Sequence, residues 1–333
     1  MHYIGSEKDR KTVLNANIAK DLARSCGFDL CGITAPEVIP DAVERFDRWL
    51  AEGNHAAMDW LVSSRDRRVN PRELLPNVRS VIMLGVNYYN PNTKHIPSGF
   101  GRVSRYARGR DYHKVLGRMI KHFINKAQQA QGARTEDDFF WWVDYGAFLE
   151  REYARAAGVG YIGKNTMLIN RDYASWVFLA EVLTSVDLQA DDSSVVDHGS
   201  CGECTLCIDA CPTEAISEET GVDSRRCISY LTIERPREIP EEHARRMGSM
   251  VFGCDICQEV CPHTSRSQLT RHRDFLPEAG VGEFVDCHRV LTMTTREQFL
   301  DLTAGTPLTR PRLENLQRNA RIVLDNQRRD EDS

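Results

Sequence analysis

Eight of the eleven cysteines fall in two short motifs whose spacing suits iron–sulfur clusters. The first motif, C-x2-C-x2-C-x3-C-P, is the bacterial ferredoxin pattern, and it contains Cys201, Cys204, Cys207 and Cys211. The second is a variant with three cysteines before a proline, completed by an upstream cysteine: Cys227, Cys254, Cys257 and Cys261. Three thiolates in one tight loop can face three corners of a cube, so the fourth must come from another segment.

In the ferredoxin pattern the fourth cysteine of each motif serves the other cluster. The sequence therefore predicts two [4Fe-4S] clusters with crossed ligands. One cluster takes Cys201, Cys204, Cys207 and Cys261, and the other takes Cys211, Cys227, Cys254 and Cys257. Structural zinc bound by four cysteines is the alternative, but two paired cysteine motifs of this kind fit it poorly. Cys26, Cys31 and Cys287 are isolated, and we expect them to be small buried hydrophobes.

Composition and charge further limit the classes of protein to which the chain can belong. The chain has 333 residues, a formal net charge of -5 and no apolar run near the ~20 residues that a membrane span needs. No signal segment is recognisable, which predicts a cytoplasmic protein without a membrane partner. Two stretches are locally basic: 102–121, with seven Lys and Arg against one Asp, and 310–329. Each is either a solvated helix face or a contact for nucleic acid.

Hydrophobic periodicity predicts elements that would position these motifs. Helices are predicted at 12–26, 114–130, 148–157 and 313–324, and strands at 28–33, 80–89, 139–144 and 176–183. Strands that alternate with helices favour an α/β (α+β) domain with a buried, parallel sheet. A polar link near residue 190 predicts three units: an α/β domain (1–190), a ferredoxin-like two-cluster module (191–270) and a helical region with a disordered DEDS tail (271–333).

Several separated segments, from about Arg65 to Gln327, resemble the epoxyqueuosine reductase family, the cobalamin-dependent iron–sulfur enzymes of tRNA queuosine synthesis. Besides the two cysteine motifs, the segments are RDRRVNPRELLPNVRSVI from Arg65, RYARGRDYH from Arg105, VDYGAFLEREYARAAGVGYIGKNTMLIN from Val143, WVFLAEVLT from Trp176 and PLTRPRLENLQRNA from Pro307. The resemblance implies that the first domain binds base-off cobalamin and that the two clusters reduce its cobalt. The implied reaction converts epoxyqueuosine to queuosine at the wobble position of tRNA.

The resemblance implies that Asp144 donates a proton in this reaction. Reducing an epoxide to an alkene consumes two electrons and two protons and expels oxygen as water, so an acid is required. Asp144 is the last residue of a predicted strand and lies beside Trp141, Trp142 and Tyr145, whose bulk would raise its pKa. The alternative is that Asp144 caps the following helix.

The resemblance also implies which residues line the corrinoid: Arg68, Leu168, Ile169, Asn170, Ser229 and Asp255, with Lys164 and Asn165 as weaker candidates. A turn or surface role is the alternative for each polar member. Asp111 and His113 approach the D-x-H-x-x-G motif of other cobalamin proteins, but Gly117 is one residue too far along. His113 is therefore not assigned as a cobalt ligand.

The implied partners are the anticodon stem-loop of tRNA, at the basic stretches and 235–237, and a low-potential electron donor such as ferredoxin or flavodoxin. The protein is expected to be a monomer. Tyr145 and Ala147 stand where the family usually has a small hydroxyl residue and a proline, and the chain ends soon after Gln327, before the usual helical-repeat tail. We therefore expect an altered pocket and weaker tRNA binding. The alternatives are an iron–sulfur or corrinoid electron-transfer protein, or a related reductase such as a reductive dehalogenase.

Overall fold

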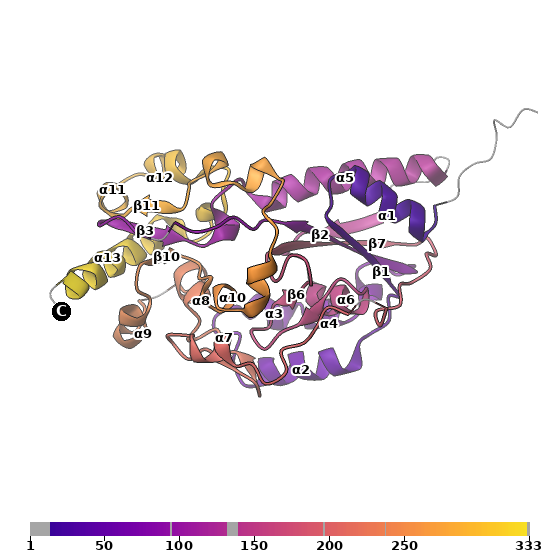
Figure 1. Cartoon of the computed structure of the whole chain (residues 1–333), viewed down its shortest axis with the longest axis horizontal. Coiled ribbons are helices and arrows are strands. Elements are labelled where there is room, and N and C mark those ends of the chain that lie inside the picture. Colours follow the sequence, from indigo (N-terminus) through magenta and orange to yellow (C-terminus); the bar gives the residue numbers. More distant parts are fainter. Residues whose placement is uncertain (1–13, 94, 132–138, 196, 237, 332–333) are drawn as a thin grey trace, which may run out of the picture.

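Four apolar strands form the main sheet, in the order β1-β2-β7-β4 (Figure 1). Their bounds are β1 (Leu30–Thr34), β2 (Ser80–Asn87), β4 (Phe139–Trp142) and β7 (Val177–Thr184). The structure is a computed structural model that describes residues 14–93, 95–131, 139–195, 197–236 and 238–331. The strands therefore lie where the sequence predicts them, within a few residues.

All three pairings in this sheet are antiparallel, so the prediction of a parallel sheet is wrong. The α/β (α+β) class is confirmed in its α+β sense. Alternation of strands and helices does not fix strand direction, because an excursion between two strands can return the chain in either sense. Here β2 and β7 are neighbours although β4 lies between them in the sequence.

Both faces of the main sheet are covered by helices, as the apolar strands predict. Ile82, Leu84 and Val86 alternate along β2 toward the core shared with α1 (Ala16–Ser25) and α5 (Tyr112–Gln131). Val81 and Met83 face the opposite core, which includes α6 (Glu150–Ala156). The helix α1 begins after Asn15, whose side chain accepts a hydrogen bond from the Ile18 N–H, and ends before Gly27 at a φ of +97°.

A second, three-stranded sheet draws one strand from each of the three predicted units. In it β3 (Phe100–Val103) pairs in parallel with β10 (Met250–Phe252) and antiparallel with β11 (Phe284–Asp286). The long helix α13 (Arg312–Glu331) packs against it through Leu316, Ala320 and Val323, which are fully buried. The division at 190 and 270 stays a prediction, and these units share a core.

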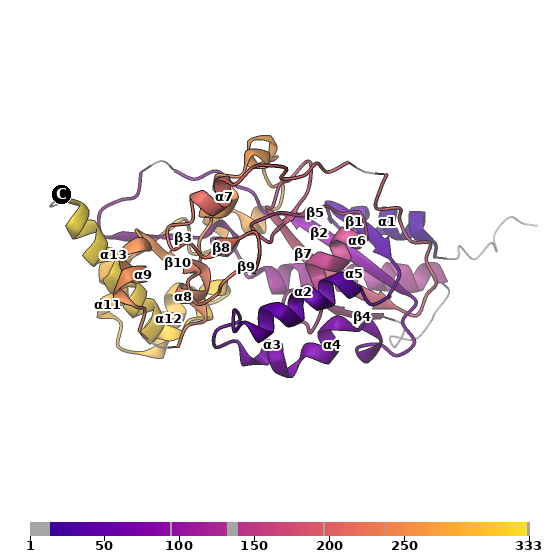
Figure 2. The ribbon, with the colours of Figure 1, turned by 90° about the horizontal axis from the view of Figure 1, so that it is seen from below.

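The C-terminal helix is longer than predicted. It includes Asp330 and Glu331, so the expectation that the DEDS tail is disordered is wrong for these two residues, and the last two lie outside the described range. The two ends of the molecule differ in content: α1, α5 and the main sheet lie at one end, and α13 with α9 (Glu241–Arg246), α11 (Cys287–Thr292) and α12 (Arg296–Thr303) lies at the other (Figures 1 and 2).

The remaining α-helices and strands of the described residues complete the fold. They are α2 (Pro40–Ala51), α3 (Asp59–Ser63), α4 (Arg65–Val69), β5 (Tyr161–Ile162), β6 (Leu168–Ile169), α7 (Leu206–Asp209), β8 (Ile216–Ser217), β9 (Gly221–Val222), α8 (Ile228–Ile233) and α10 (Ile256–Glu259). Among the described residues, no helix combines the length and the apolar character needed to cross a membrane.

Candidate active site and cluster centre

Four cysteines from two distant motifs line one cavity of about 230 Å³. They are Cys201, Cys204, Cys207 and Cys261. The backbone N–H of Lys164 donates to Cys201 Sγ at 3.4 Å, an arrangement that suits a thiolate ligand. The structure therefore brings together the four residues that the crossing rule groups, including the one contributed by the second motif.

The other four cysteines also lie together. Burial raises the pKa of Cys254 and Cys257, and charge on neighbouring thiols adds to the shift: Cys227 and Cys211 act on Cys254, and Cys254 and Cys227 act on Cys257. The backbone N–H of Ala215 donates to Cys211 Sγ at 3.3 Å. The mutual effects of these thiols show that the four cysteines lie near one another.

The two cysteine sets fit cubane clusters. Two short helices, α7 and α10, carry the third cysteine of each motif, Cys207 and Cys257, and pack against each other. In a [4Fe-4S] cluster each thiolate binds a different iron, so the four sulfurs need not converge on one ion. In the described part of the chain, no group of three or more His, Cys, Asp or Glu is arranged to hold a single metal ion.

The turn between β5 and β6 touches both cysteine sets. Lys164 contacts Cys201 through its backbone, and Asn165 donates from its side chain to the carbonyl oxygen of Cys257 at 3.4 Å. Tyr161 lies 3.1 Å from His263 and 3.9 Å from Cys201 Sγ, measured from its hydroxyl oxygen. The segment after α6 that contains Gly158, Gly160 and Gly163 thus packs on the two-cluster module.

Asp144 lies two residues after β4, where it meets the start of α5. The Tyr112 hydroxyl donates to Asp144 Oδ2, and His113 Nε2 lies 3.7 Å from the same oxygen. Asp111 Oδ1 holds the other imidazole nitrogen at 2.8 Å, and the Tyr112 and His113 rings stack at 4.1 Å. Helix α6 has Leu149 at its N-cap, so the alternative role of Asp144 as a helix cap is wrong.

The prediction that the pKa of Asp144 is raised is also wrong. Burial by itself raises this pKa, but the ion pair with His113 and the hydrogen bond from Tyr112 outweigh it, and the pKa is lowered. The side chain keeps 53% of its surface exposed even though protein atoms crowd around it. Asp144 is therefore a carboxylate at neutral pH, and a proton that it donates must first come from a neighbouring group.

His113 is the neighbouring group that carries this proton. Burial lowers the pKa of His113, but its hydrogen bond to Asp111 and its ion pair with Asp144 raise it to about 9. Because Tyr112 keeps its proton to still higher pH, the site at neutral pH contains an imidazolium, a phenol and a carboxylate. Such a site can pass a proton to a basic oxygen.

We predict that His113 titrates near pH 9. The raised pKa means that the ion pair with Asp144 contributes its full stability below the ordinary histidine pKa of ~6.5 and loses it as pH rises through about 9. The measurement is an NMR titration of ¹³C-labelled histidine, with His113→Gln used to assign the resonance. Asp111→Asn should lower the midpoint, and a midpoint near 6.5 in the unaltered protein would contradict the ion pair.

Three other ionisable groups surround the loop that carries Asp144. Arg68 donates from Nη1 to the carbonyl oxygens of Gly146 at 3.0 Å and Phe148 at 3.4 Å. Burial raises the pKa of Glu150, and the charge of Asp144 raises it further, to about 8. Glu181, in the centre of β7, is fully buried. Arg68, predicted to line a corrinoid, thus holds the Asp144 loop in this structure.

The other predicted corrinoid residues are mostly interior. Leu168, Ile169 and Asn170 are buried, and the Asn170 side chain donates to the Val159 carbonyl oxygen at 2.7 Å. Ser229 is half-buried beside Cys227. A corrinoid role for these residues stays a prediction, and for the buried ones it would involve backbone atoms.

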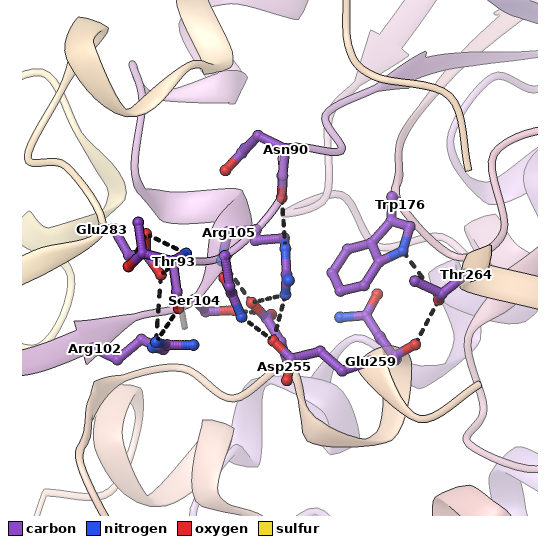
Figure 3. A network of polar contacts seen from close by, with 12 residues as sticks. Asn90, Thr93, Arg102, Ser104, Arg105, Trp176, Asp255, Glu259, Thr264 and Glu283 are labelled. Atoms are coloured by element: carbon purple, nitrogen blue, oxygen red, sulfur yellow. Dashed lines mark hydrogen bonds and ion pairs between the residues drawn. The ribbon is translucent and has the colours of Figure 1, made fainter. Parts of the chain in front are cut away.

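Asp255, the sixth predicted corrinoid residue, joins the two-cluster module to the first domain (Figure 3). It accepts hydrogen bonds from the Ser104 hydroxyl, the Arg105 backbone N–H at 2.8 Å and Arg105 Nη1 at 3.2 Å. The Arg105 guanidinium also donates to Glu259 at 2.6 Å and lies over the Trp176 ring at 4.6 Å. Asp255 lies between two cluster ligands, so this buried network fixes the second cysteine motif against the sheet.

The basic stretch at 102–121 divides into buried and exposed residues. Arg105 and Arg108 are buried, and Arg102 and Arg108 lie 3.5 and 3.7 Å from Glu283. The remaining cations are exposed on or near α5: Arg110, Lys114, Arg118 and Lys121. The first half of this stretch is therefore neither a solvated helix face nor a contact for nucleic acid, because its arginines join internal networks.

An all-thiolate module for two clusters beside a histidine–carboxylate site defines an iron–sulfur oxidoreductase. Two family models match: the 4Fe-4S double cluster binding domain at residues 200–264, and epoxyqueuosine reductase QueG, DUF1730, at residues 68–144. The epoxyqueuosine reductase of Leadbetterella byssophila is 38% identical over 92% of this chain and 97% of its own length. That of Synechocystis sp. is 44% identical over 72% of this chain and 81% of its own. The chain belongs to the epoxyqueuosine reductase family.

Solved structures agree with this assignment. A crystal structure of epoxyqueuosine reductase with an epoxyqueuosine-modified tRNA-Tyr stem loop matches with a TM-score of 0.81 at 26% identity, over 93% of this chain and 80% of that one. The Bacillus subtilis enzyme, in a structure with its catalytic aspartate loop swung out of the active site, matches with a TM-score of 0.80 at 27% identity, over 93% and 81% of the two chains.

Proposed function

We propose that this chain reduces the epoxide of epoxyqueuosine in tRNA to the alkene of queuosine. The observation that carries the proposal is the Asp144 site, where an imidazolium and a phenol meet one carboxylate in a chain of this family. The reaction takes two electrons and two protons and releases the epoxide oxygen as water. Two [4Fe-4S] clusters on the crossed cysteine sets would pass the electrons one at a time.

In this proposal the side chains around Asp144 hold and transfer a proton of the reaction. The carboxylate receives a proton from His113, which Asp111 holds in place, and delivers it to the departing oxygen. Tyr112 fixes the orientation of Asp144 through its hydroxyl. Cobalamin, which the family resemblance implies, supplies a strongly reducing cobalt centre when bound, and Arg68 and Ser229 are the half-buried candidates to contact it.

The exposed cations around the start of α5 support a tRNA partner. Arg110, Lys114, Arg118 and Lys121 lie on or near the helix that carries Tyr112 and His113, so phosphates bound there would bring an RNA loop to the site. We further propose a low-potential donor such as ferredoxin or flavodoxin, a monomeric enzyme and a cytoplasmic location.

Anaerobic turnover tests the function. The reconstituted protein, with cobalamin and a strong reductant, is given a tRNA stem loop that carries epoxyqueuosine, and the nucleosides are measured by mass spectrometry. Queuosine is the expected product. Both clusters and corrinoid present without any product would contradict the proposal and favour the electron-transfer alternative.

A further inference from the structure

Glu181 is an unusual residue for the centre of a sheet. Its side chain is 0% exposed, and neither carboxyl oxygen has a hydrogen-bond partner among the described residues. It shares its face of β7 with Leu179 and Leu183, and its cross-strand neighbours are Met83 and Trp142. A carboxylate in such surroundings would be strongly destabilised, because nothing replaces its hydration.

The Glu181 carboxyl lies directly under the Asp144 loop. A Cβ placed on Gly146 would come within 3.0 Å of Glu181 Oε1 and 2.8 Å of Trp142 Cβ, so only glycine allows the loop to lie this close. Arg68 binds the carbonyl oxygen of the same glycine at 3.0 Å. Gly146 is thus held between a guanidinium and a buried carboxyl, two residues beyond Asp144.

The charges that face Glu181 favour its neutral form. Burial raises its pKa well above the ordinary value, and the negative charges of Glu150, from α6, and Asp144, from the loop, raise it further. Arg68, from α4, opposes them. The cross-strand neighbours Met83 and Trp142 carry no charge.

We propose that Glu181 is a positioning residue that carries a proton and seats Gly146, and thereby holds the Asp144 loop in the site. If the loop moves away and water reaches the carboxyl, Glu181 ionises, and its charge then opposes return of the loop beside Asp144 and Glu150. Loop closure is therefore coupled to the uptake of a proton. The catalytic consequence rests on the proposed function, but the loop coupling does not.

Hydrogen exchange of the backbone amides at 143–149 tests the coupling without substrate. We expect Glu181→Gln, which keeps the shape and cannot ionise, to exchange within about threefold of the unaltered protein at pH 7, and Glu181→Ala to exchange more than about tenfold faster. Leu183→Ala is the matched control at 143–147, because Leu183 lies on the same strand and face but is not among the atoms nearest to Gly146. Phe148 is left out of this comparison, since it shares a core cluster with Leu183. Leu183→Ala should leave exchange at 143–147 unchanged.

The pH dependence of loop opening distinguishes a role for the Glu181 proton from a role in packing alone. After correction for intrinsic exchange, loop opening in the unaltered protein should rise more steeply with pH than in Glu181→Gln, by about an extra tenfold per pH unit. Glu150 is present in both proteins, so the difference between the two slopes reports the titration of Glu181 together with its coupling to Glu150. Equal slopes, an unchanged loop in Glu181→Ala, or a Glu181→Gln variant as loose as Glu181→Ala would each overturn the proposal.

Kinetics then connect the loop to catalysis. Glu181→Ala should lower kcat for the modified stem loop more than about tenfold without raising KM, while Glu181→Gln retains most of the turnover. If the unaltered protein has no turnover, the proposed function fails, and the exchange results still decide the role of Glu181. If Glu181→Gln exchanges normally but loses turnover, the positioning role is overturned, because the Glu181 proton is then consumed in the reaction.

Discussion

Replacing Asp144 by asparagine is expected to lower kcat for the modified stem loop by roughly 10²- to 10⁴-fold, the usual range for loss of a positioned acid–base group. The backbone of Asp144 has a φ of +65°, a region that asparagine adopts as readily as aspartate, so the loop itself should not be strained. The amide can still accept from Tyr112 but cannot receive and release the His113 proton.

The measurement is single-turnover kinetics under anaerobic conditions, together with iron content and visible absorption. The clusters should remain, because Asp144 contacts none of their ligands among the described interactions. Asp187→Asn serves as the control, since Asp187 is a surface residue paired with Arg79 at 2.6 Å. An Asp144→Asn variant with normal turnover would eliminate the proposed proton route, whatever the identity of the substrate.

Combinations of cysteine variants should reveal the crossed ligands. Cys204→Ala and Cys261→Ala lie in different motifs but face the same cavity, so each is expected to remove the same cluster and half of the bound iron and sulfide. The double variant of these two should still hold half. Pairing Cys261→Ala with Cys257→Ala, its neighbour in the motif, should leave none.

The measurement is iron and sulfide per chain after anaerobic reconstitution, with Cys26→Ala as a control that keeps both clusters. Ligands that followed the linear motifs would give the reverse result: the neighbouring pair would retain half of the iron, and the distant pair would retain none. Turnover should be lost in every variant that lacks a cluster, because both clusters are needed to carry electrons.

Much of the fold could be predicted from the sequence because its signals are local. The apolar runs at β2 and β7 and the cysteine spacing each depend on residues close together in the chain. Strand direction is not a local property, because it depends on how the segments between strands return. For this reason the sequence predicts a parallel sheet where the structure has an antiparallel one. The family resemblance identified Asp144, which no local pattern distinguishes from a helix cap.

The partners of Asp144 escaped prediction because they are distant in sequence. Tyr112 and His113 lie about thirty residues earlier, and the only local signal was the pairing of Asp111 with His113. The pKa of Asp144 depends on burial opposed by hydrogen bonds, a balance that the sequence does not reveal. Glu181 did have a signal, since it is the one charged residue in the apolar run WVFLAEVL.

The β10-β3-β11 sheet has a consequence for how the protein is made. The first strand to leave the ribosome is the central one, β3, and both of its partners are encoded far downstream. At ~5–20 residues per second, β3 would wait between about 7 and 30 s for β10 with both edges unpaired. Open strand edges promote aggregation. Fragments that end before β10 should therefore depend on chaperones.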